Sequence, residues 1–198
     1  MSHRKTSLRT QIIIVKITMA SILIATLISA LVTHKYNRII YIITSTLLII
    51  APDLLRKFHN LQFSDRAELA YLSFIFISAI LGINLDLYHS TAWLDKLSHT
   101  LSGALTAIVA WLILKHRHLI DTPTSFKVVF ILSFSLAIAV IWEIYEFLVN
   151  FILHTDPQRV ISTGVTDTML DLIVAGLGAA TVTVYLFRKK TAKPKSSA

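Results

Sequence analysis

The chain has 198 residues, of which 55% are hydrophobic and only 15% charged, and its mean hydropathy is +0.68. This composition is typical of polytopic membrane proteins and excludes a soluble domain with a polar surface, while the absence of cysteine excludes disulfides, thiolate metal sites and cysteine nucleophiles. The formal net charge of +8 is carried by short loops and tails beside apolar runs, so we expect contacts with membrane lipids, chiefly anionic headgroups, and no nucleic-acid partner.

Six apolar segments are long enough to cross a hydrocarbon core of about 30 Å. We therefore predict an all-α membrane helix bundle, with residues 1–198 forming a single integral membrane domain that ends in a basic cytoplasmic tail at 188–198. The predicted spans lie near residues 11–33, 39–55, 69–87, 94–114, 128–153 and 168–187.

The first two spans are flanked or interrupted by residues that affect how they are interpreted. The first follows a basic segment with Arg4 and Arg9, but its apolar run is longer than that of a signal peptide, so we predict a retained helix. The apolar stretch of the second ends at Ala51 and continues into Pro52 and Asp53. We therefore expect the second helix to be short, tilted or partly interfacial.

Lysine and arginine are distributed unequally about these spans. With six crossings and the N-terminus inside, fifteen basic residues fall on the inner side, and the outer side holds only Lys35, Arg38, Lys96 and Arg159. This positive-inside asymmetry supports an even number of crossings and predicts that both termini are cytoplasmic.

Polar residues interrupt the last three spans in three pairs: Asp95 with His99, Glu143 with Glu146, and Asp167 with Asp171. A carboxylate near the bilayer centre costs about 2.5 to 3.5 kcal/mol, so five carboxylates and one histidine in a small protein predict a shared site. Spacings of three or four residues place each pair on one face of its helix. In the predicted topology all three pairs lie in the outer half of the membrane, at a depth where they can meet.

Carboxylates with one imidazole and no thiolate suit divalent cations such as Mg, Mn, Ca, Zn or Fe. The predicted ligands of such an ion are Asp95, His99, Asp167 and Asp171. Glu143 or Glu146 would act as general base, and Lys96 or Arg159 would pair with a substrate phosphate. Without a cation, the same clustering would keep some of the carboxyls protonated, which suits proton handling.

Simpler interpretations exist for each of these residues. Asp95 and Asp167 lie where an N-cap carboxylate satisfies free amides, and the deeper groups also fit a structural polar network between helices. Ser98 and Ser102 beside His99 could form a nucleophile with its base, but small residues in membrane helices are more often packing positions.

The segments that carry these pairs resemble a known family. Trp93–Gly103 with its Asp-x3-His, the Trp-Glu-x2-Glu at 142–146 and the Asp-Thr-x2-Asp at 167–171, followed by Gly176 and Gly178, are similar to the YjdF-type family of uncharacterised bacterial membrane proteins over residues 80–185. A looser resemblance runs to VanZ-like proteins, although Asp171 stands where those have a customary Asn. The resemblance implies a multi-pass protein of the bacterial cytoplasmic membrane, linked to envelope or glycopeptide stress, and implies no particular reaction.

Three functions fit this pattern. The first is a metal-dependent hydrolase or transferase that acts on a lipid or lipid-linked envelope substrate from the outer leaflet. The second is an ion- or proton-coupled transporter or binding protein, and the third is a non-catalytic envelope protein with a structural polar network. The inner halves of the last three spans are almost wholly apolar, with Thr106, Ser133 and Ser135 among the exceptions, which favours a one-sided pocket over a continuous path.

Overall fold

The computed structural model describes residues 2–59, 64–157 and 163–191, and the regular elements within these ranges are all helical. Six helices are long and apolar enough to cross a membrane, which confirms the predicted all-α architecture. The single domain and the cytoplasmic termini stay predictions. The candidate spans are Ser7–Val32, Arg38–Phe58, Asp65–Asn84, Trp93–His116, Thr124–Leu153 and Thr166–Arg188.

Helix α2 (Arg38–His59) is longer than the short or interfacial segment that its sequence suggested. Its 22 residues rise about 33 Å, enough for a full crossing, and the helix continues through Pro52. A proline inside a helix removes the hydrogen bond to the carbonyl four residues earlier, here that of Leu48. The Tyr71 hydroxyl donates to this Leu48 carbonyl at 2.8 Å, so a neighbouring helix satisfies the acceptor that Pro52 cannot.

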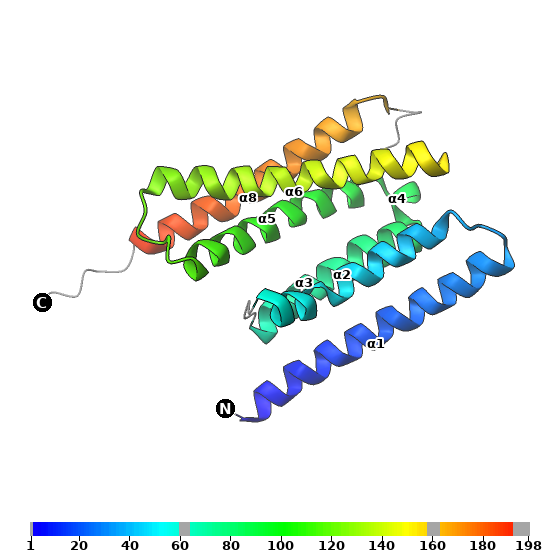
Figure 1. Cartoon of the computed structure of the whole chain (residues 1–198), viewed down its shortest axis with the longest axis horizontal. Coiled ribbons are helices and arrows are strands. Elements are labelled where there is room, and N and C mark those ends of the chain that lie inside the picture. Colours follow the sequence, from blue (N-terminus) through cyan, green and yellow to red (C-terminus); the bar gives the residue numbers. More distant parts are fainter. Residues whose placement is uncertain (1, 60–63, 158–162, 192–198) are drawn as a thin grey trace, which may run out of the picture. The chain divides into compact units, whose positions relative to one another are not determined.

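The chain forms two compact units, Met1–Ser98 and His99–Ala198. The first unit contains α1 (Ser2–Val32), α2, α3 (Asp65–Ile75), the π-helix η1 (Phe76–Asn84) and α4 (Leu87–Ser90), coloured blue to green in Figure 1. Its apolar core is formed by side chains from α1, α2, α3 and η1, the most deeply buried being Met19, Leu72, Ile75 and Ile80.

The π-helix is a feature that the apolar pattern of this segment did not predict. Within it, the side-chain amide of Asn84 donates to the Ala79 carbonyl at 2.8 Å and to the Ser45 hydroxyl at 2.7 Å. These bonds tie the end of η1 to α2. A side chain at Gly82 would collide with the Tyr88 ring, since an added Cβ would lie 2.3 Å from its Cζ.

The second unit is formed by α5 (Ala92–His116), α6 (Thr124–Leu153) and α8 (Thr166–Thr191), with α5 beginning just before the division and continuing into it (Figure 1). Helix α8 includes residues 188–191, so the first part of the predicted tail is helical, while 192–198 and Arg159 lie outside the described residues. The core of this unit is rich in small side chains, with Ala107, Ala110 and Ala179 fully buried.

Helices α5 and α8 approach to backbone contact at two glycines. A Cβ on Gly103 would lie 1.9 Å from the Ala175 carbonyl oxygen, and a Cβ on Gly178 would lie 2.0 Å from that of Thr100. Neither overlap can be relieved by moving a side chain, because the atoms that the added Cβ would meet belong to the backbone. Small residues at such positions are how membrane helices pack closely, and here they set the spacing between α5 and α8.

Candidate functional site

Helix α5 carries the first two predicted site residues near its start. Asp95 lies in its first turn, and His99 follows one turn later on the same face. His99 is 7% exposed and Asp95 is half-buried. At 1.5 Å per residue, His99 lies about 9 Å along the span that begins at Trp93.

The His99 imidazole is the point at which the three helices of the second unit converge. Its Nε2 lies 3.9 Å from Oε1 of Glu143 on α6 and 3.8 Å from Oδ1 of Asp171 on α8. Glu143 and Asp171 are 5% and 3% exposed, so all three groups are buried. The structure thus brings together one member of each pair that the sequence singled out.

Asp95, His99 and Asp171 each offer one ligand atom within 4.8 Å of the other two. Metal bonds of about 2.0 to 2.3 Å place ligand atoms on opposite sides of an ion at most about 4.0 to 4.6 Å apart. The 3.8 Å between His99 and Asp171 falls within this limit, and it is too long for a hydrogen bond. Two carboxylates and one imidazole are donors that magnesium, manganese, zinc and iron accept.

Glu143, Glu146 and Asp167 do not belong to this group of three ligand atoms, although Glu143 lies 3.9 Å from His99. Glu146 is half-buried and accepts a hydrogen bond of 2.9 Å from the Trp142 indole, one turn earlier on α6. Asp167 is 5% exposed and lies in the first turn of α8, one turn before Asp171. A carboxylate at that position is favoured by the helix dipole, so its burial has an explanation without a ligand.

Two other sequence-based interpretations are weakened by the contacts. Lys96 Nζ lies 3.1 Å from the Asp95 carboxylate, so the lysine suggested as a phosphate partner is already paired with an acid. The buried Ser98 hydroxyl donates to the Leu94 carbonyl at 2.9 Å, an intrahelical bond typical of serine in membrane helices. Ser98 therefore does not aim its hydroxyl at His99 as a nucleophile would.

The first unit contains a charged network that the sequence analysis missed. Lys16 on α1 lies 2.8 Å from both Asp53 on α2 and Glu68 on α3, and Arg56 pairs with Glu68 as well. The Glu68 side chain is 4% exposed, those of Lys16 and Arg56 23% and 37%. Lys16 and Arg56 are two of the fifteen basic residues that the predicted topology places on the inner side. The sequence signal for this network is Lys16, a lysine inside an apolar span, because a charge in such a position needs a partner of opposite charge.

The fold and the buried polar group define a polytopic membrane protein with an intramembrane acid and histidine cluster. The chain belongs to the family described as "Predicted membrane protein (DUF2238)", which matches residues 14–192. It is also similar to an "Uncharacterized protein" of Thermotoga maritima, with 31% identity over 146 residues that cover 72% of this chain and 73% of the relative. No solved structure matches.

These comparisons bear on the resemblance inferred from the sequence. Membership of a family of membrane proteins agrees with a YjdF-type protein, although the comparisons do not use that name. The looser likeness to VanZ-like proteins has no support from them. The family match covers the first two helices as well as the second half, where the quoted motifs lie.

Proposed function

We propose that this protein binds a divalent metal ion with Asp95, His99 and Asp171 and uses it in a hydrolase or transferase reaction on a lipid or lipid-linked envelope substrate. The observation that carries the proposal is the buried His99 imidazole, placed 3.8 Å from Asp171 and 3.9 Å from Glu143. Asp167, one turn before Asp171, is the candidate for a further ligand. The proposed location is the cytoplasmic membrane of a bacterium, since the matching relative is bacterial.

A bound divalent ion would supply a hydroxide at neutral pH by acidifying a coordinated water. Glu143 is the preferred general base, because it is buried and its carboxylate lies 3.9 Å from His99 Nε2. For His99 to be a ligand, Nε2 must be unprotonated and directed toward the ion. The carboxylates of Glu143 and Asp171 lie 3.9 and 3.8 Å from Nε2, so this nitrogen faces the acidic groups that would surround the ion.

A membrane-dissolved substrate is favoured by the surroundings of Glu143. The neighbouring α6 residues Ile141, Ile144 and Phe147 have exposures of 60%, 52% and 54%, which is typical of a lipid-facing surface. A substrate with an acyl or polyprenyl chain would approach the site from that side. Further along the same helices the core is formed by Ala107, Ala110 and other apolar residues, and the buried Ser135 and Thr183 there are uncharged, which supports a one-sided pocket rather than a transport path.

The first test is metal analysis of the detergent-purified, monodisperse protein by ICP mass spectrometry, beside His99→Gln and Asp171→Asn. Asp121→Asn is the matched control, because it makes the same change at an exposed carboxylate in the loop between α5 and α6. We expect stoichiometric metal in the wild type and the control, and its loss in the two site variants. A wild type that takes up no metal even after loading with each candidate ion would overturn the proposal.

The enzymatic part is tested separately with Glu143→Gln. This variant should retain metal but lose hydrolysis of lipid-linked phosphate substrates presented in mixed micelles. Metal retention with unchanged turnover in Glu143→Gln would exclude this glutamate as the base. If the wild type takes up metal but hydrolyses none of a broad panel of such substrates, the metal site is supported and the proposed reaction is excluded.

A further inference from the structure

The end of η1 is joined to the start of α5 by a short segment that is hydrogen-bonded at every step. Backbone amides donate to carbonyls at 2.9 to 3.3 Å along the whole of it: Leu85 to Ile80, Asp86 to Ile83, His89 to Asp86, Thr91 to Leu87, and Leu94 to Thr91. Asp95 follows Leu94 directly and lies in the first turn of α5. A change in the register of η1 is therefore passed along this segment to the position of Asp95.

The turn between η1 and α4 is fixed by packing and by its backbone conformation. Gly82 packs against the Tyr88 ring, and an added Cβ would lie 2.3 to 2.7 Å from three of the ring atoms. Asp86 has a φ of 62° and is left-handed, a conformation that aspartate adopts more readily than most residues. Helix α4 is thus held against η1, so the two elements are expected to move together.

Asn84 anchors the end of η1 to α2. Its side chain is 4% exposed, and its amide donates to the Ala79 carbonyl and to the Ser45 hydroxyl, which belongs to a residue that is 1% exposed. The Ala79 carbonyl can only accept, which fixes the orientation of the amide. Thr44 and Thr46 on α2 donate to carbonyls one turn earlier in their own helix. Ser45 instead accepts the bond from Asn84, so it links two helices.

The same side chain favours the π-helical register of η1. Its nine residues exceed the single turn in which π-helices usually occur, and the Leu85 amide donates to Ile80, five residues earlier. An α-helical register would move this bond to Leu81 and, because an α-helix turns more per residue, would rotate everything that follows about the axis. Ala79 is likewise five residues before Asn84, so the side-chain bond matches the π-helical spacing and opposes that rotation.

We propose that Asn84 is a positioning residue for the metal ligand Asp95. It holds η1 in its π-helical register, and through α4 it sets where the first turn of α5 lies. The inference deepens the proposed function, since it rests on Asp95 being a ligand of the ion. Asn84 acts through the backbone that leads to Asp95 and not by contact with the ion.

The test is a double-mutant cycle of metal affinity, measured by titration calorimetry of the detergent-purified full chain with the ion that it takes up. Leucine keeps the branched shape of asparagine but makes no hydrogen bond, and Asn84→Leu should weaken metal binding about tenfold, as for groups that orient a metal ligand. In an Asp95→Asn background the same change should have no further effect, because the positioned ligand is already lost. An unchanged affinity of Asn84→Leu, or an equal loss in both backgrounds, would overturn the proposal.

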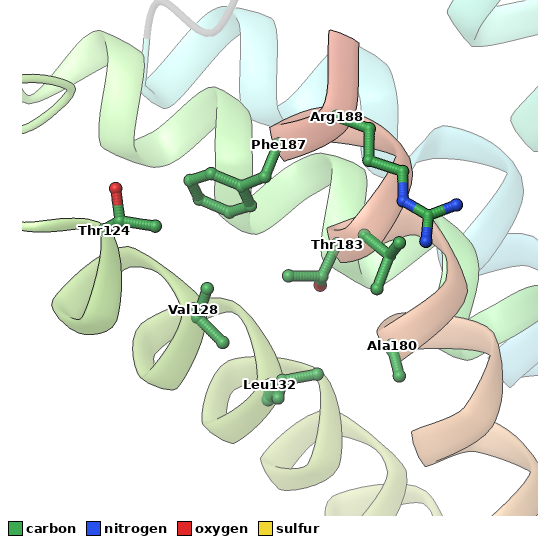
Figure 2. Close-up of a pocket in the computed structure, with 8 residues that line it drawn as sticks. Thr124, Val128, Leu132, Ala180, Thr183, Phe187 and Arg188 are labelled. Atoms are coloured by element: carbon green, nitrogen blue, oxygen red, sulfur yellow. The ribbon is translucent and has the colours of Figure 1, made fainter. Parts of the chain in front are cut away.

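Two control variants separate positioning from a general loss of stability. Ser78→Ala removes a hydroxyl of η1 that donates to the Phe74 carbonyl at 2.9 Å within the same segment. Leu132→Ala removes apolar contacts at a pocket between α6 and α8 (Figure 2), about 16 Å along α6 from Glu143. Both should bind metal as the wild type does, although Leu132→Ala should unfold at a lower temperature. A tenfold weaker affinity of Leu132→Ala would show that lost stability alone explains the effect and would overturn the proposal.

Hydrogen exchange of the backbone amides of residues 85–95, without metal, tests the positioning itself. Asn84→Leu should accelerate exchange in this segment and leave residues 130–140 of α6 as in the wild type. Ser45→Ala removes one of the two bonds, so it should show a smaller acceleration, and it replaces Asn84→Leu if that variant does not fold. Unchanged exchange at 85–95 would overturn the proposal even if metal binds. A wild type without metal would instead overturn the proposed function, while exchange still decides whether Asn84 places Asp95.

Discussion

The two units of this protein each bury charged groups inside membrane-spanning helices, but they do so in opposite ways. In the first unit, two cations and two anions, Lys16 and Arg56 with Asp53 and Glu68, pair at short distances and neutralise one another. In the second, the buried His99 imidazole lies 3.9 Å from Glu143 and 3.8 Å from Asp171, and His99, Asp95 and Asp171 each offer a ligand atom within 4.8 Å of the other two. The first arrangement consists of paired opposite charges, whereas the second brings together the donor types that the proposed metal ion would accept.

The side chains of the two charged clusters also differ in length and flexibility. Lysine, arginine and glutamate have long flexible side chains, so the first network can tolerate small shifts of α1, α2 and α3. Aspartate and histidine are short, and their distances depend on the spacing of the helices that carry them. That spacing is set by the backbone contacts of Gly103 with Ala175 and of Gly178 with Thr100, the residue that follows His99.

The largest effect is expected for Gly178→Ala. The added methyl meets the Thr100 carbonyl at 2.0 Å, and separating the helices to relieve this overlap should destabilise the protein by about 3 kcal/mol and abolish metal binding. Thermal unfolding in detergent and metal content are the measurements. Gly176→Ala is the control, because its Cβ would lie 3.5 Å from Leu136 Cδ2, an ordinary contact. Equal stability of the two variants would show that the glycine contact does not hold the site.

Added metal should raise the free energy of unfolding of the wild type through the His99 cluster, and the ion pairs of the first unit should not contribute to this increase. At a metal concentration about 100 times Kd, binding adds about 2.7 kcal/mol to the free energy of unfolding. Asp171→Asn should gain nothing from the same metal, yet without metal it should be as stable as the wild type or more so, since it removes a negative charge from an acidic cluster. A marked loss of stability of metal-free Asp171→Asn would instead favour the structural network.

Glu68→Gln should lower the free energy of unfolding, in contrast to metal-free Asp171→Asn. It leaves Lys16 and Arg56 without their buried acid and should destabilise the protein by about 2 kcal/mol, less than for a fully buried pair because both cations are partly exposed. Chemical or thermal unfolding, followed with and without metal, measures this change. If Glu68→Gln were as stable as the wild type while Asp171→Asn was not, the contrast between the two units would be reversed.

The smallest effect is expected for Asp53→Asn. Its side chain is 51% exposed, so its ion pairs with Lys16 and Arg56 are screened and should contribute about 0.5 kcal/mol. Lys16 also retains its contact with Glu68 in this variant. A loss comparable to that of Glu68→Gln would show that the network acts as one unit in which every member is required.

The candidate site illustrates where sequence reasoning succeeds and where it stops. The pairs Asp95 with His99 and Glu143 with Glu146 were recognisable because a charged group inside an apolar helix is costly and rarely accidental. Helical spacing placed the members of each pair on one face, but it could not decide which member faces the other helices. The rotation of α6 decides this, directing Glu143 to His99 and leaving Glu146 with Trp142.

By itself the sequence determined the class of protein and the six candidate membrane spans, because the length and hydropathy of each segment are local properties. In hydrocarbon, each spanning segment must also satisfy its backbone hydrogen bonds within its own helix. Helix packing determined everything that depends on two segments at once. The Tyr71 bond that lets α2 continue past Pro52, the pairing of Lys16 with Glu68, and the backbone contact at Gly103 that sets the distance from His99 to Asp171 all join residues far apart in the chain. Such contacts arise from the rotation and crossing of packed helices, and no periodicity within one segment encodes them.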